Sequence, residues 1–190
     1  LNATAERMTV NRCDHRDGEF LPHPRRLLAV MGLCEVDGGD DAAARELLEA
    51  AVALGPVRPR ANQELARLRL AEFLARPAGA GGRIDTAQTA RVLEALFAAR
   101  GAAPPLAEVY ELIAEAWARS IITPGTDHLG VLDEGVRFFP RTTALVYATA
   151  AQKVRAGLVA DARSLIDLGL RVATEAETRR KFETLKASLP

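Results

Sequence analysis

Residues 28–56, LAVMGLCEVDGGDDAAARELLEAAVALGP, contain the pattern that decides the fold. Apolar residues recur about one helical turn apart on both sides of the Gly38-Gly39 pair. Glycine readily takes the left-handed conformation that ends a helix, and an aspartate such as Asp40 caps the start of the next helix. Gly55-Pro56 then ends the second apolar segment. The stretch therefore predicts two antiparallel helices joined by a tight turn.

The same alternation of apolar helical spacing and glycine or proline breaks continues to the end of the chain. A hairpin of this size cannot bury its own apolar face, but a row of stacked hairpins can. Before the last segment, Thr174 and Glu177 have the spacing of a capping box. The pattern predicts an all-α fold, an α-solenoid of about four antiparallel helix hairpins with a C-terminal capping helix. We expect hairpins over residues 22–56, 58–100, 105–140 and 143–173, a cap over 174–189, and an irregular segment over 1–21.

Small residues recur at matched intervals in the second helix of two hairpins. Gly39 is followed by Ala44 and Ala51, and Gly157 is followed by Ala162 and Gly169 at the same spacing. Such residues lie on one helix face, where a neighbouring helix can approach closely. These intervals therefore predict where successive helices pack.

This pattern resembles the tetratricopeptide repeat (TPR), a unit of about 34 residues. Gly32, Ala44 and Ala51 match the small positions of that unit, and Pro56 matches its proline. The resemblance covers roughly residues 25–170. It is weaker in the third hairpin, where His128 occupies a small position, and weakest in the second hairpin.

In the TPR family the first helix of each unit lines a concave groove, so the resemblance implies a non-catalytic protein–protein interaction scaffold. Its expected partner is a peptide or protein segment bound in that groove. The lysine and asparagine set of the family members that bind a C-terminal carboxylate is absent. The groove positions carried over to this chain are Arg60, Gln63, Arg67, Leu70, Glu108, Glu111, Glu115, Arg119, Tyr147, Ala151 and Arg155.

Composition argues against several other functions. Lysine and arginine together number 25, as do aspartate and glutamate, so the net charge of +0 lacks the basic surplus of a nucleic-acid-binding protein. No apolar run approaches the ~18 residues of a membrane span, and we expect a soluble protein. Lysine occurs only three times, and the surplus of arginine and alanine is typical of GC-rich bacterial genomes. The bacterial cytoplasm and export after removal of an upstream signal peptide both stay open.

Candidate catalytic and metal-binding residues lack the spacing that their chemistry needs. Cys13, Asp14, His15 and His23 are potential ligands, but no paired motif brings four of them together. None of the serines lies in a nucleophile elbow. Trp117 shares an apolar helix face with neighbours and is interpreted as a core residue. We therefore expect no cofactor, no metal and no catalysis in this chain.

Two alternatives to a peptide-binding scaffold remain. The polar start and the missing initiator methionine suggest that the chain is the accessory C-terminal module of a larger enzyme, such as a hydrolase, with its catalytic domain upstream. Residues 1–21 would then include the tail of an upstream unit. The exposed edge of a hairpin could alternatively pair with a second copy, which would make the chain a self-association module.

Overall fold

The fold is given by a computed structural model that describes residues 23–190. Within that range the chain forms nine α-helices and one short 3-10 turn. The elements are α1 (Pro24–Gly38), α2 (Asp41–Ala53), α3 (Pro59–Ala75), η1 (Ala80–Gly82), α4 (Thr86–Arg100), α5 (Ala107–Arg119), α6 (Thr126–Phe138), α7 (Thr143–Arg155), α8 (Val159–Val172) and α9 (Ala176–Ala187).

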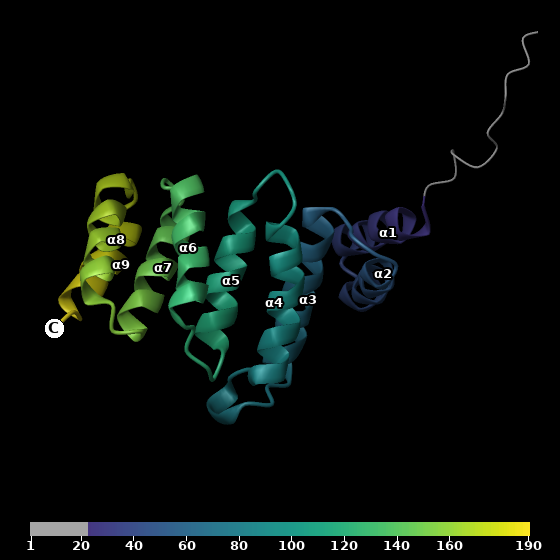
Figure 1. Cartoon of the computed structure of the whole chain (residues 1–190), viewed down its shortest axis with the longest axis horizontal. Helices are drawn as coiled ribbons and strands as arrows, with labels where there is room; N and C mark the ends of the chain where they lie inside the picture. Colours follow the sequence, from purple (N-terminus) through teal and green to yellow (C-terminus); the bar gives the residue numbers. More distant parts are fainter. Residues whose placement is uncertain (1–22) are drawn as a thin grey trace, which may run out of the picture.

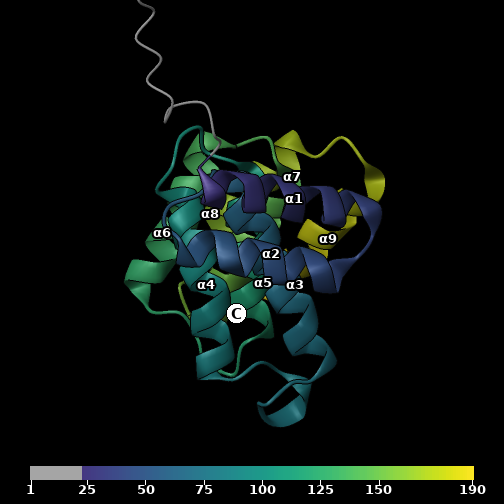
Figure 2. The same ribbon diagram turned by 90° about the vertical axis from the view of Figure 1, so that its right-hand side faces the viewer.

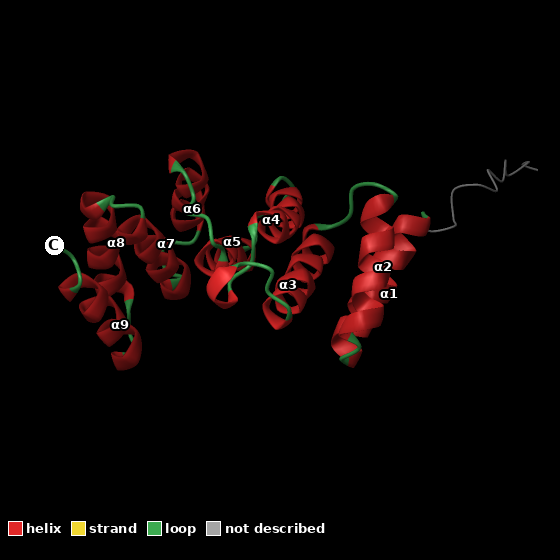
Figure 3. Cartoon of the chain, turned by 90° about the horizontal axis from the view of Figure 1, so that it is seen from below, coloured by secondary structure: helices red, strands yellow, loops and turns green. Residues whose placement is uncertain are grey.

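The helices pair into hairpins α1–α2, α3–α4, α5–α6 and α7–α8, and α9 packs against α8 and α7. The hairpins follow one another in a row, as the view from below shows (Figure 3). First helices contact one another from hairpin to hairpin, α1 with α3, α3 with α5 and α5 with α7. The predicted all-α solenoid is confirmed.

The first hairpin is set differently from the others. Helices α3 to α9 run in roughly one direction in Figure 1, whereas α1 and α2 run across that direction (Figure 2). Two ion pairs link α2 to α3, with Arg69 Nε 3.3 Å from Glu49 Oε1 and Arg45 Nη1 3.4 Å from Glu72 Oε2. The repeat pattern did not predict this change of direction.

Side-chain caps start two of the described helices, α2 and α4. Asp40 accepts a hydrogen bond from the Ala43 backbone N–H at 3.0 Å, and Gly39 ends α1 in the left-handed conformation with φ 82°. A capping box forms at α4, where Asp85 and Gln88 satisfy each other's backbone donors. The capping box predicted at Thr174 is wrong. Helix α9 begins at Ala176 with Glu175 as its N-cap, and the Glu175 side chain accepts a bond from the Thr178 hydroxyl but caps no backbone N–H of the helix.

Small residues lie where the helices meet, as the intervals predicted. Ala44, Ala51 and Ala162 are fully buried. A Cβ added at Gly135 would lie 2.6 Å from the Tyr110 ring, and one at Gly169 would overlap the ring of Phe182. These positions therefore admit no larger side chain without a shift of the partner helix.

Three apolar clusters form the core, one beneath α1–α3, one in the middle of the row and one at its C-terminal end. Trp117 is buried in the middle cluster, as expected, with its ring 5.1 Å from that of the exposed His128. Polar links bridge the hairpins. Lys153 Nζ lies 2.9 Å from Asp133 and 3.3 Å from Asp161, which joins α7 to α6 and α8.

Two further findings concern the described residues 23–190. None of their helices is long and apolar enough to span a membrane. They contain no group of three histidine, cysteine, aspartate or glutamate side chains placed to hold a metal ion. Of the metal candidates named above, Cys13, Asp14 and His15 lie outside the described range, and His23 precedes α1.

Candidate protein-binding surface

The predicted groove residues of α3 lie beside acidic side chains of the same chain. Arg60 Nη2 is 3.9 Å from Asp37 Oδ1 at the end of α1. Arg67 Nε donates a 2.7 Å hydrogen bond to Glu64, which raises the pKa of Arg67. Gln63, between the two, is half-buried. Both arginines are partly neutralised, yet their side chains are exposed enough to reach a ligand.

Leu70 is a correction to the predicted groove. Its side chain is only 3% exposed and belongs to the middle core cluster. Helix α3 packs against α4 and α5 on this side, so its apolar positions face those helices. Leu70 stabilises the junction of the second and third hairpins and is not open to a ligand.

The predicted residues of α5 form an acidic strip. Glu108 and Glu115 are exposed, and Glu111 between them is half-buried. Burial raises the pKa of the Glu111 carboxyl, and the nearby charge of Glu108 raises it further. Arg119 lies 3.9 Å from Glu115 at the end of the strip. Negative charge therefore dominates this part of the surface.

The predicted residues of α7 make structural contacts. Tyr147 packs edge-on against the Phe182 ring at 5.5 Å between centroids. Arg155 Nη1 donates to the carbonyl oxygen of Trp117 at 3.1 Å, and burial followed by the neighbouring charge of Arg83 lowers its pKa. These contacts tie α7 to α9 and α5.

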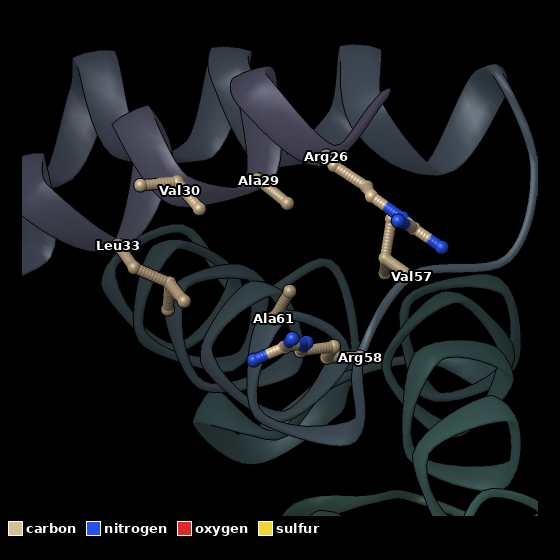
Figure 4. A pocket seen from close by; sticks show the side chains of 7 residues that line it. All are labelled: Arg26, Ala29, Val30, Leu33, Val57, Arg58 and Ala61. Atoms are coloured by element: carbon tan, nitrogen blue, oxygen red, sulfur yellow. The ribbon is translucent and has the colours of Figure 1, made fainter. Parts of the chain in front are cut away.

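A pocket that the sequence reasoning missed lies between α1 and α3 and encloses about 280 Å³. Figure 4 shows Ala29 of α1 and Ala61 of α3 facing each other across the pocket. The pocket stays open because both side chains are small, and larger ones would fill it. Its lining residues are Arg26, Ala29, Val30, Leu33, Val57, Arg58 and Ala61.

The two charged residues that line this pocket are both arginines. Arg26 and Arg58 are exposed, and among residues 23–190 neither has a carboxylate within 4.0 Å. Arg26 lies in the first turn of α1 and Arg58 is the N-cap of α3, and the first turn of neither helix contains an acidic residue. Helix N-termini carry a partial positive charge, so both helices add to the potential of the arginines.

The same repeat register could have found part of the pocket. Carried back to the first unit, the groove positions of the resemblance fall on Arg26, Ala29 and Leu33. The contribution of Val57 and Arg58 depends on the crosswise setting of the first hairpin, which the repeat does not encode.

No protein-family model and no curated protein matches the sequence. The crystal structure of a thermophilic TPR protein from Thermus thermophilus is similar, with a TM-score of 0.53 and 21% sequence identity over 86% of this chain and 82% of that chain. The chain has a TPR-like fold.

The strips lie on the first helices α3 and α5, and the pocket lies between the first helices α1 and α3, with Val57 and Arg58 of the preceding loop in its lining. Helix α3 contacts both α1 and α5, so the pocket, the partly paired arginines of α3 and the acidic strip of α5 belong to adjoining helices. We call this set of surfaces the first-helix surface of α1, α3 and α5.

Proposed function

We propose that this chain is a non-catalytic scaffold that binds a segment of another protein along the first-helix surface of α1, α3 and α5. The observation that carries the proposal is the open pocket between α1 and α3, where apolar walls and two arginines without an acidic partner among residues 23–190 lie together. Partner segments commonly combine an anchoring side chain with weaker contacts around it. Here the pocket would hold the anchoring side chain, and the charged faces of α3 and α5 would make the weaker contacts around it.

The order of charges on this surface favours a segment of mixed charge. Arginines dominate at the α1–α3 pocket and along α3, whereas glutamates dominate on α5. A segment with acidic residues at one end and basic residues at the other would match both regions. This order of charges would also orient the bound segment, with its acidic end at the α1–α3 pocket and its basic end at α5.

Affinity capture tests this function. The full chain is immobilised and exposed to a lysate of its source cells, in parallel with a variant that carries Arg60→Glu and Arg67→Glu. We expect a specific partner to bind the wild type and to be depleted on the variant by charge repulsion. The matched control carries Arg179→Glu and Arg180→Glu on the exposed face of α9 and should retain the partner. Equal recovery of every protein on all three chains would contradict the groove assignment.

A further inference from the structure

We infer that the α1–α3 pocket binds an acidic residue next to a large apolar side chain in the partner segment. This inference rests on the proposed function and names the chemistry of the segment. The apolar side chain enters the space between Ala29 and Ala61, and the acidic group lies between the guanidinium groups of Arg26 and Arg58.

The size and walls of the pocket match an apolar side chain. A volume of about 280 Å³ is roughly nine times the ~30 Å³ that a water molecule occupies in the liquid. Val30, Leu33 and Val57 line it together with the two alanines, so its interior offers apolar contact and little hydrogen bonding. Filling such a space with an apolar group removes surface from water on both sides.

The rim of the pocket matches a carboxylate. Arg26 extends from α1, whereas Arg58 extends from the N-cap position just before α3, on the opposite wall (Figure 4). A guanidinium donates two parallel hydrogen bonds to a carboxylate, and such charge-assisted bonds are the stronger ones. Among residues 23–190 both groups lack an acidic partner, so a ligand would not need to displace an existing ion pair.

The surroundings favour a peptide over a polyanion such as a nucleic acid. A chain of phosphates that continued from α3 onto α5 would meet Glu108, Glu111 and Glu115. The pocket interior also offers apolar walls, which a phosphate backbone cannot use. A short acidic group beside an apolar side chain satisfies both halves of the site.

Peptide selection on the full chain tests the inference. A phage-displayed library of random dodecapeptides is selected in parallel against the wild type, an Arg26→Glu/Arg58→Glu variant and the Arg179→Glu/Arg180→Glu control. We expect the wild type and the control to select a large apolar residue within two positions of aspartate or glutamate. We expect the pocket variant to lose that consensus.

The selected peptide, labelled with fluorescein, then gives affinities by fluorescence anisotropy. Arg58→Glu should weaken binding by at least about tenfold, since a charge-assisted hydrogen bond is replaced by repulsion. Ala29→Leu, which fills the pocket without changing its charge, should weaken binding similarly. An Arg26→Gln/Arg58→Gln variant replaces the charge reversal if circular dichroism shows that the latter does not fold.

The outcomes separate the inference from the proposed function. Peptides that lack an acidic residue, or that bind the charge-reversed variant equally well, overturn the pocket chemistry and leave the scaffold function standing. Failure to enrich any peptide also overturns the inference, and the capture experiment above then decides the scaffold function alone.

Discussion

The two ends of the row of hairpins differ in what they present to solvent. At the C-terminal end, α9 inserts the fully buried Phe182 against Gly169 and exposes Glu175 and Arg179. At the N-terminal end, α1 exposes apolar side chains instead, with Leu27, Val30 and Met31 at 48%, 58% and 44%. A repeat array needs a polar terminal cap for solubility. One end has such a cap within the described residues, and the other offers an apolar surface beside the pocket.

Removal of the buried ring should show the largest difference between the two ends. Phe182→Ala deletes the only fully buried side chain of α9 and should lower the free energy of unfolding by about 3–5 kcal/mol. The matched truncation at the other end, Met31→Ala, removes an exposed side chain and should change it by less than about 0.5 kcal/mol. Urea unfolding followed by circular dichroism measures both. Similar losses in the two variants would mean that the N-terminal face is covered in solution.

A single added methyl group compares the packing at the two ends. Gly169→Ala drives a Cβ into the rigid, buried Phe182 ring, and we expect a loss of about 2–3 kcal/mol. Gly32→Ala places its Cβ 2.8 Å from Cγ of the fully buried Leu48 and 3.2 Å from the Ala44 carbonyl oxygen, a slighter overlap than the one with the Phe182 ring, and we expect a smaller loss of about 1 kcal/mol. Thermal unfolding of both variants provides the test. A greater loss at Gly32 would show that the first hairpin is the more tightly packed end.

Alanine substitutions in the turns of the first and fourth hairpins should cost similar amounts of stability, whereas substitutions on the packed faces of these hairpins should not. Gly39 has φ 82° and Gly157 has φ 75°, and a Cβ at either would meet no other atom within 4 Å. Alanine at each position therefore adds only the backbone strain of the left-handed conformation, about 1–2 kcal/mol. Equal shifts in the denaturant midpoint of Gly39→Ala and Gly157→Ala would confirm this. Unequal shifts would show that one turn can change its conformation.

Much of the fold was predictable because its determinants are local. Glycines and prolines mark the helix ends, and small residues at matched intervals mark the helix contacts, so Ala44 and Ala162 were placed correctly in the core. The crosswise first hairpin was not predictable. Its contacts with α3 include ion pairs such as Arg69–Glu49, which join residues 20 apart in the chain and which no repeat spacing encodes.

The candidate site was less predictable than the fold for the same reason. The repeat register indicates which positions lie on a first helix, but Leu70 shows that a neighbouring helix can cover such a position. The pocket was missed because it needs Val57 and Arg58, which follow the unit's proline in the loop before α3, where the resemblance assigns no groove position. Surface chemistry thus follows from how hairpins are set against each other, which sequence spacing does not encode.

Acid should weaken the middle of the row, where a polar network links the hairpins that separate the two ends. Glu134 Oε2 lies 2.7 Å from Arg100 Nη2, and its Oε1 accepts a 2.7 Å hydrogen bond from Tyr110. The bond from Arg100, followed by the bond from Tyr110, lowers the pKa of Glu134 to about 2 from 4.5. A depressed folded-state pKa gives stability that is present above the unfolded value near 4.5 and is lost as the pH falls toward 2.

Glu134→Gln tests this linkage. The variant should be less stable by about 1 kcal/mol at pH 7, below what the full pKa shift implies, because solvent screens a carboxylate that is partly exposed. Its deficit should shrink between about pH 5 and pH 2, since the wild type loses the same interaction there. Urea unfolding across this pH range measures the difference, with Glu183→Gln on the exposed face of α9 as the control. A deficit that stays constant with pH would show that the charge of Glu134 does not join the hairpins. Differences in stability along the row of hairpins would then come from apolar packing alone.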